Sequence, residues 1–196
     1  MSKSVFNAAQ FHACVDSADK LDYAQAEVAF VGRSNVGKSS LVNAICGRRL
    51  LAKISKTPGK TRTINVFSIG YGKWIVDLPG YGFAAVSIKE KDNWKYMIEC
   101  YFSGRPSLKA IFVLVDAHVG ATVLDRQMLA WLKSTARPYR VIVNKIDRIT
   151  QTKLVEQRRS LALDLGVMPE HILWVSTKKG TGIKELQSVI SGFLLL

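Results

Sequence analysis

Hydrophobic positions along the chain follow two alternating periods. Short apolar runs predict six β-strands, at 28–31, 64–69, 73–78, 110–116, 139–144 and 172–175. Apolar residues at three- and four-residue spacing predict helices at 41–45, 89–103, 124–132 and 151–165 and from 183 onward. Strands that alternate with helices predict an α/β fold, with a mainly parallel six-stranded sheet and helices on both faces. A ligand of such a sheet binds at the carboxyl ends of the strands.

The 196 residues fit one domain that is large enough to bury a core. Residues 1–24 have low periodicity, and we expect a lead-in that packs on the domain, with a short strand or helix edge around 5–11. Residues 25–196 form the domain itself. Within it, residues 48–62 carry six basic residues and no acid, and Pro58 and Gly59 predict a long loop there.

A glycine-rich loop joins the first predicted strand to the helix after it. It reads GRSNVGKS and matches the phosphate-binding pattern GxxxxGKS. Glycine permits turns that bring backbone N–H groups against phosphate oxygens at the positive end of the helix. Lys38 adds a charge at the terminal phosphates, and the Ser39 hydroxyl can coordinate Mg²⁺. The predicted phosphate site is Gly32, Arg33, Ser34, Asn35, Val36, Gly37, Lys38 and Ser39.

The strand at 73–78 ends in DLPG, a second element of a nucleotide site. Asp77 is placed to hold Mg²⁺ through a water molecule. The backbone N–H of Gly80 can contact a terminal phosphate and so sense its presence. We assign to the site Asp77, Leu78, Pro79 and Gly80.

The sequence NKID after the strand at 139–144 predicts the choice of base. The carboxylate of Asp147 accepts hydrogen bonds from two adjacent N–H groups, which guanine offers and adenine does not. Asn144 braces the loop, and the stem of Lys145 lies along the base. A backbone N–H after the last strand can meet the guanine carbonyl oxygen. The predicted base site is Asn144, Lys145, Ile146, Asp147, Val175, Ser176, Thr177 and Lys178.

The net charge of the chain indicates the kind of partner it binds. Lys and Arg outnumber Asp and Glu by 28 to 15, a net charge of +13. Such an excess on a small domain favours a polyanionic partner, nucleic acid or an anionic membrane surface.

The motifs together resemble one family. GRSNVGKSS from Gly32, SKTPGKT from Ser55, DLPGYGFA from Asp77 and NKID from Asn144 resemble the EngB family of bacterial ribosome-biogenesis GTPases over almost the whole chain. The resemblance implies a single P-loop GTPase domain that hydrolyses GTP to GDP and phosphate. It implies a partner in the large ribosomal subunit, its RNA and proteins, and a need for the protein in normal cell growth and division.

The resemblance also assigns residues of the basic loop. Thr61 would be a switch threonine that closes over Mg²⁺ when GTP is bound, so that the metal site is Ser39, Thr61 and, through water, Asp77. The residues that line the nucleotide would be Gly59, Lys60, Thr61, Arg62 and Thr63. Arg62 departs from the family, where glutamine is common.

Two residues predict how hydrolysis proceeds. Many GTPases orient the attacking water with a glutamine directly after DxxG, and this chain has Tyr81 there. A phenol does not orient water as an amide does, so we expect a slow intrinsic rate. In related GTPases an asparagine at the position of Asn35 binds a potassium ion that supplies the missing charge, and we treat Asn35 as a K⁺ ligand. The alternative is that Asn35 only caps the loop.

Two other functions fit parts of the sequence. One is a nucleotide-dependent RNA-binding module with incidental turnover, and the other is a membrane-associated signalling GTPase. The sequence predicts neither a secretory signal nor a lipid anchor, and Cys14, Cys46 and Cys100 follow no metal-ligand spacing. We therefore expect a protein of the reducing cytoplasm without contact to a membrane. We also expect it to act as a monomer.

Overall fold

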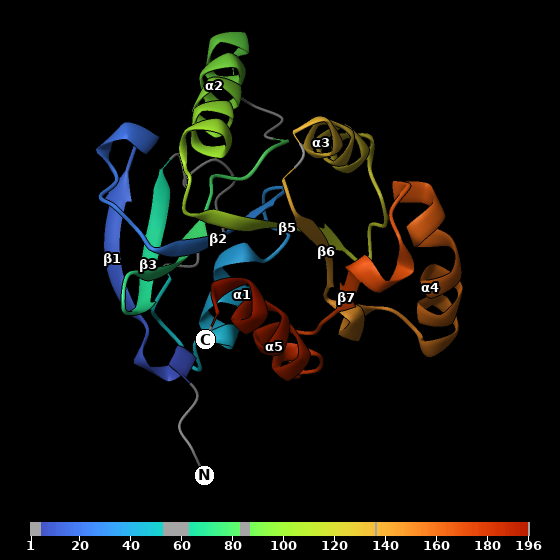
Figure 1. Ribbon diagram of the computed structural model, residues 1–196. Coiled ribbons are helices and arrows are strands. Elements are labelled where there is room, and N and C mark those ends of the chain that lie inside the picture. Colours follow the sequence, from blue (N-terminus) through green and yellow to red (C-terminus); the bar gives the residue numbers. More distant parts are fainter. Residues whose placement is uncertain (1–4, 53–62, 83–86, 136, 196) are drawn as a thin grey trace.

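A single twisted sheet runs through the middle of the molecule (Figure 1). The structure is a computed structural model that describes residues 5–52, 63–82, 87–135 and 137–195. Among these residues, seven strands lie in the order β1-β3-β4-β2-β5-β6-β7. The strands are β1 (Gln10–Val15), β2 (Ala26–Gly32), β3 (Ile64–Gly70), β4 (Lys73–Asp77), β5 (Leu108–Asp116), β6 (Tyr139–Asn144) and β7 (Ile172–Trp174).

The sheet is parallel from β4 to β7 and antiparallel at its other edge. β1 pairs with β3, and β3 with β4, in antiparallel register, whereas β2 pairs in parallel with both β4 and β5. Every residue of β2 is buried, because helices cover both faces of the sheet at its centre. Strands that are covered on both faces have nearly continuous apolar sequences, and this pattern predicted β2 and β5.

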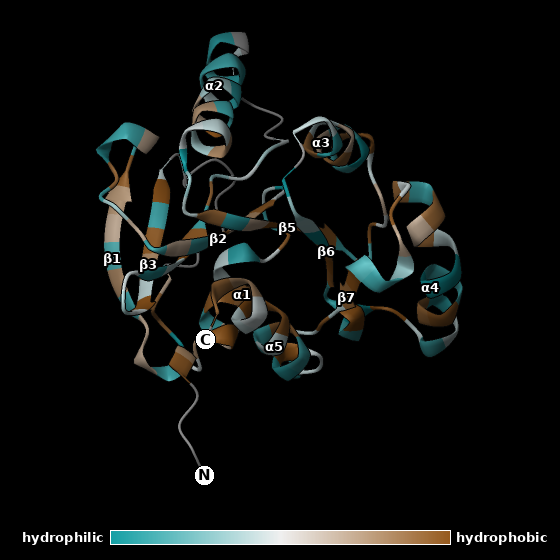
Figure 2. Ribbon diagram, viewed as in Figure 1, coloured by the Kyte–Doolittle hydropathy of each residue, from teal (hydrophilic) through white to brown (hydrophobic). Residues whose placement is uncertain are grey.

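Helices divide between the two faces. The α-helices among the described residues are α1 (Lys38–Ile45), α2 (Ile88–Gly104), α3 (Val123–Ser134), α4 (Gln151–Leu165) and α5 (Ile183–Leu194). Residues of α2, α3 and α4 share one hydrophobic core with the side of β2 that carries Ala29 and Val31. Residues of α1 and α5 share the other core with Val28 and Phe30. Figure 2 shows hydrophobic residues in brown along the central strands and on α1 and α5.

Four short 3₁₀ helices complete the described elements. They are η1 (Val5–Ala8), η2 (Ala18–Lys20), η3 (Ile146–Arg148) and η4 (Pro169–His171).

The predicted architecture is confirmed, with one more strand than the six expected. The additional strand is β1, which comes from the predicted lead-in and pairs with β3. Its six residues are exposed or only partly buried, so hydrophobic alternation did not reveal it. Pairing with a neighbour, rather than local pattern, makes this segment a strand.

A buried ion pair anchors the segment before β2. Nε and Nη2 of Arg105 donate to the two carboxylate oxygens of Glu27 at 2.9 and 3.0 Å. Nη1 of Arg105 donates to the backbone carbonyls of Leu21 and Asp22. The guanidinium also lies over the ring of Trp74, 5.5 Å from its centroid. Glu27 is completely buried near the amino end of β2. The network therefore stabilises the end of the sheet opposite the carboxyl ends of the parallel strands.

Candidate functional site

The phosphate loop, the DLPG sequence and the NKID sequence all lie at the carboxyl ends of parallel strands, as predicted for an α/β sheet. A loop follows each of these strands, at 33–37 after β2, 78–82 after β4, 117–122 after β5, 145–150 after β6 and 175–182 after β7. The whole phosphate loop, from Gly32 to Ser39, lies within the described residues.

The phosphate loop requires glycine at one position for two reasons. Gly37 has a φ of 105°, which side chains rarely adopt, and a Cβ there would lie 2.6 Å from Nδ2 of Asn144. Gly37 is also the residue before the first turn of α1, and in the described ranges no side chain caps that turn. The N–H groups at the start of α1 are therefore available to an anion.

Three polar side chains meet behind the loop. Lys38 is buried, and its Nζ donates to the carbonyl of Gly32 at 3.4 Å. Ser39 Oγ donates to Oδ2 of Asp77 at 2.8 Å. Burial lowers the pKa of Lys38 although the charge of Asp77 acts against that shift. Burial raises the pKa of Asp77, while Lys38 and the hydrogen bond from Ser39 oppose the rise. Burial therefore disfavours the charged form of each group, and the opposite charge of its neighbour favours that form.

The same cluster fits a magnesium ion. Oδ1 of Asp77 is buried and has no hydrogen-bond partner among the described residues. A carboxylate oxygen and a serine hydroxyl are hard oxygen donors of the kind that Mg²⁺ accepts together with water and phosphate oxygens. Within the described ranges, no group of three His, Cys, Asp or Glu side chains could hold a metal ion.

The loop after β4 lies against the phosphate loop. A Cβ on Gly80 would be 2.9 Å from Nζ of Lys38 and 3.0 Å from the carbonyl oxygen of Gly32, so a side chain there would require Lys38 and the phosphate loop to shift. The Tyr81 N–H donates to the Gly32 carbonyl at 3.2 Å, and the Ser34 N–H donates to the Tyr81 carbonyl at 3.0 Å.

This loop is also tied to the helices beside it. Nε1 of Trp94 in α2 donates to the carbonyl of Pro79 at 2.9 Å, and the rings of Trp94 and Tyr81 pack edge to face. The side chain of Tyr81 is buried and donates to Asp125 in α3. The phenol thus points into the protein, a placement that sequence reasoning missed because it depends on where α3 lies.

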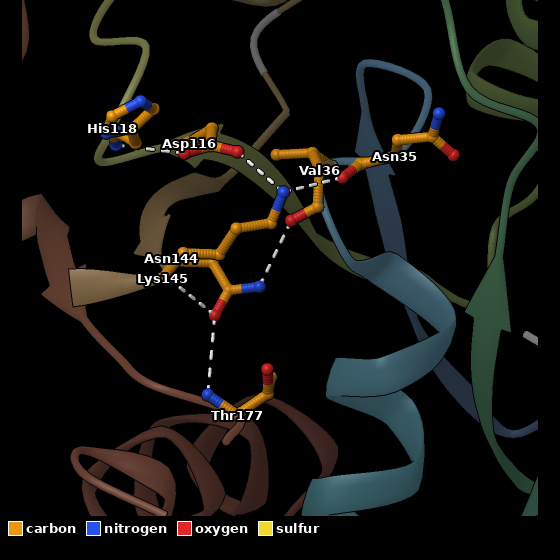
Figure 3. A network of polar contacts seen from close by, with 7 residues as sticks. All are labelled: Asn35, Val36, Asp116, His118, Asn144, Lys145 and Thr177. Atoms are coloured by element: carbon orange, nitrogen blue, oxygen red, sulfur yellow. Dashed lines mark hydrogen bonds and ion pairs between the residues drawn. The ribbon is translucent and has the colours of Figure 1, made fainter. Parts of the chain in front are cut away.

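The NKID loop is bonded directly to the phosphate loop (Figure 3). Nδ2 of Asn144 donates to the carbonyl of Val36 at 3.1 Å. Oδ1 of Asn144 accepts from the N–H of Lys145 at 2.8 Å and of Thr177 at 3.4 Å. Nζ of Lys145 donates to the carbonyl of Asn35 at 2.7 Å. One side chain, Asn144, therefore connects the phosphate loop, the NKID loop and the loop after β7.

The carboxylate of Asp147 is oriented by a hydrogen bond from Ser176. Its Oδ1 accepts a hydrogen bond of 2.5 Å from Oγ of Ser176, whose oxygen also accepts from the N–H of Lys179. The hydrogen bond from Ser176 lowers the pKa of Asp147, and nearby Lys178 and Arg148 act in the same direction. Asp147 therefore remains an anionic acceptor at neutral pH.

Four residues of the predicted nucleotide site lie outside the described residues, namely Gly59, Lys60, Thr61 and Arg62. Thr63 is described, and its Oγ1 accepts a hydrogen bond from Sγ of Cys14 in β1 at 3.1 Å.

Sequence reasoning also missed Asp116, the last residue of β5. Its Oδ2 lies 2.6 Å from Nζ of Lys145. The available signal was its position, because a polar residue that ends a buried parallel strand lies at the site edge of the sheet.

Known proteins are similar to this chain in both sequence and fold. The family model of the 50S ribosome-binding GTPase matches residues 27–145. A probable GTP-binding protein EngB of Thermotoga maritima is 44% identical over 171 residues, which cover 86% of each chain. A crystal structure of a probable GTP-binding protein EngB has a TM-score of 0.71 and 26% identity, over 87% of this chain and 99% of that one. A structure of Era with MgGDPNP and nucleotides of 16S ribosomal RNA has a TM-score of 0.65 and 26% identity, over 88% and 58%.

The fold and these matches define a P-loop GTPase domain. Within that class, the chain belongs to the EngB family of GTP-binding proteins. None of the helices in the described ranges is long and apolar enough to cross a membrane.

Proposed function

We propose that the chain is a GTP-hydrolysing switch that assists assembly of the large ribosomal subunit. The observation that carries this proposal is the bridge through Asn144, which joins a phosphate-binding loop to a base-binding loop in one hydrogen-bonded unit. Such a unit can report the state of the nucleotide to the surfaces around it. We further propose that the protein works in the cytoplasm as a monomer and is needed for normal growth and division.

Guanine selection rests on Asp147. The Ser176 hydroxyl occupies one side of the carboxylate and fixes its direction. The remaining acceptor sites suit the N1–H and the exocyclic amine of guanine. Adenine offers an acceptor at N1, and a site built to accept hydrogen bonds from its ligand rejects an analogue that lacks those donors by about 10⁴-fold or more.

Mg²⁺ would be held by Ser39 and, through water, by Asp77, and it would neutralise charge on the phosphates. Oδ1 of Asp77, which is buried and has no hydrogen-bond partner in the described part of the chain, supports this role. Lys38 would contribute a buried positive charge to phosphate binding. The backbone N–H groups at the start of α1 would donate hydrogen bonds to the phosphates. The N–H of Gly80, in the loop against Lys38, is proposed to sense the terminal phosphate.

Intrinsic hydrolysis is proposed to be slow and to be stimulated by K⁺. Tyr81 occupies the position after DxxG, and its hydroxyl is engaged by Asp125. Asn35 has a left-handed φ of 62° and an exposed side chain that is directed away from the Lys145 network (Figure 3). That side chain is therefore free to coordinate a cation beside the phosphates.

The ribosomal partner is supported by three observations of different kinds. The matching family model describes a 50S ribosome-binding GTPase, and a solved relative, Era, was crystallised with ribosomal RNA. The net charge of +13 suits a polyanionic partner.

Co-sedimentation with purified large and small ribosomal subunits tests the proposal. We expect retention on the large subunit with a non-hydrolysable GTP analogue and release with GDP. Asp147→Asn should abolish the retention, whereas Asp164→Asn, an exposed carboxylate on α4, should not. Salt-sensitive binding to both subunits regardless of nucleotide would instead identify a constitutive RNA-binding module. Hydrolysis at equal rates in sodium and potassium would refute the role of Asn35.

A further inference from the structure

Asp116 is a polar residue of the site that no motif includes (Figure 3). It ends β5 and stands directly beside Asn144 in the parallel register of β5 and β6. Its side chain is 13% exposed and that of Lys145 is 18% exposed, so the ion pair between them is largely shielded from water. Oδ2 of Asp116 accepts from Nζ of Lys145 at 2.6 Å.

The protein fixes the carboxylate of Asp116 from its other side. Oδ1 accepts from the N–H of His118 at 2.9 Å. The turn that supplies this N–H is itself closed by hydrogen bonds from Val119 and Gly120 to the carbonyl of Asp116. The Ala117 N–H donates to the carbonyl of Asn144 at 2.8 Å, which joins the turn to β6. Asp116 is therefore a rigid acceptor.

Lys145, in contrast, needs an external restraint. It adopts a left-handed φ of 66°, unusual for a residue with a side chain, and its four-carbon stem has many rotamers. Its Nζ spans from the NKID loop to the carbonyl of Asn35, next to the carbonyl of Val36 that Asn144 contacts. Two neighbouring residues of NKID thus hold two neighbouring carbonyls of the phosphate loop.

We propose that Asp116 is a positioning residue for nucleotide binding: its carboxylate holds the Lys145 amine against the Asn35 carbonyl and so fixes the phosphate loop relative to the base site. This role rests on the proposed guanine-nucleotide site. Asp116 acts through Lys145 and does not read the base, which is the role proposed for Asp147. Its loss should accelerate release of the nucleotide without changing which base is preferred.

The test measures dissociation of fluorescent N-methylanthraniloyl GDP by stopped flow. Asp116→Asn keeps the shape and a neutral acceptor but removes the charge. A charge-assisted hydrogen bond that is partly buried corresponds to a change of about tenfold or more, so we expect release to accelerate by at least about tenfold. The ratio of GDP to inosine diphosphate affinity should stay the same, because inosine lacks only the amine that Asp147 is proposed to read.

A double-mutant cycle with Lys145→Met separates positioning from a general structural role. In the Lys145→Met background, Asp116→Asn should change the release rate by less than about twofold, because its partner is already absent. Asp164→Asn is the matched control and should leave release and melting temperature unchanged. A purely structural role would accelerate release equally in both backgrounds, and that result would overturn the inference.

The outcomes for the two proposals are distinct. Tight GDP binding by the wild type and equal release from Asp116→Asn would overturn the role of Asp116 alone. Absence of guanine-nucleotide binding by the wild type would overturn the proposed function, and with it this role.

Discussion

The hydroxyl of Tyr81 donates a hydrogen bond of 2.8 Å to Oδ1 of Asp125, and this bond connects the loop after β4 to the first turn of α3. The other oxygen of Asp125 accepts from the N–H and the hydroxyl of Thr122, which caps the helix. Asp125 is 1% exposed. One buried carboxylate therefore accepts hydrogen bonds both from the N-cap residue of α3 and from Tyr81, the residue that follows DxxG.

Tyr81→Phe removes this bond while it keeps the ring that packs on Trp94. A buried acceptor without its donor costs about 1–3 kcal/mol, so we expect the free energy of unfolding to fall by that amount. Urea denaturation followed by circular dichroism measures the difference. Tyr23→Phe, at an exposed tyrosine, is the control and should have no effect. Equal stability of Tyr81→Phe and wild type would show that the bond contributes nothing.

The same pair predicts a dependence on pH. Burial raises the pKa of Tyr81, and the neighbouring Asp125 carboxylate raises it further. Below pH of about 10 the phenol is protonated in both folded and unfolded chains, so its contribution is complete. Above that pH the unfolded chain releases the proton and the folded protein keeps it, so this contribution is lost as the pH rises. The stability difference between wild type and Tyr81→Phe should therefore shrink above pH 10 and stay constant between pH 7 and 9.

Arg105→Ala should destabilise the fold without weakening the nucleotide site. The substitution leaves the carboxylate of Glu27, which is completely buried, without its cation, and breaking a buried pair in this way costs about 3–5 kcal/mol. Chemical denaturation of the wild type, Arg105→Ala and the exposed control Arg159→Ala measures the loss. Below the unfolding transition, the affinity for GDP should be unchanged, because the pair lies at the amino end of β2. A large loss of affinity in the folded variant would contradict this separation.

Asp147→Asn should exchange guanine for xanthine. The amide can accept from N1–H and donate to the C2 carbonyl of xanthine, where guanine has an amine. We expect the preference for GDP over xanthosine diphosphate to reverse, with a change in the affinity ratio of at least about a hundredfold. Competition against a fluorescent nucleotide measures that ratio. If Asp147→Asn loses both nucleotides equally, the side chain supports the loop rather than reading the base.

The cysteines should differ strongly in reactivity. Burial raises the pKa of the Cys46 thiol to about 12, although Arg48 acts against that shift. At pH 8 only about one Cys46 thiol in ten thousand is then ionised, and the thiolate is the reactive form. Cys14 is exposed and Cys46 buried. Brief alkylation of the native protein at pH 8, followed by peptide mass spectrometry, should modify Cys14 and spare Cys46 until urea is added. Early modification of Cys46 would show that α1 opens readily at its carboxyl end.

Sequence alone predicted the elements well, because their signals are local. The buried strands are continuous apolar runs, and the predicted helix at 151–165 has the bounds of α4. The sequence pattern did not predict β1 as a strand of the sheet. The side chains of β1 are exposed or only partly buried, and the segment is a strand because it pairs with β3.

The site shows the same division. The motifs of the sequence resemble the EngB family, to which the comparisons assign the chain, and they predicted the residues of the phosphate loop and the NKID loop, because a phosphate or a guanine base requires fixed residue types on consecutive backbone positions. Only the tertiary structure decided that Asp116 pairs with Lys145 and that Tyr81 bonds to Asp125. Each pair joins segments far apart in the chain. A carboxylate acquires such a partner only when packing of the sheet and helices brings the two side chains together and excludes water from between them.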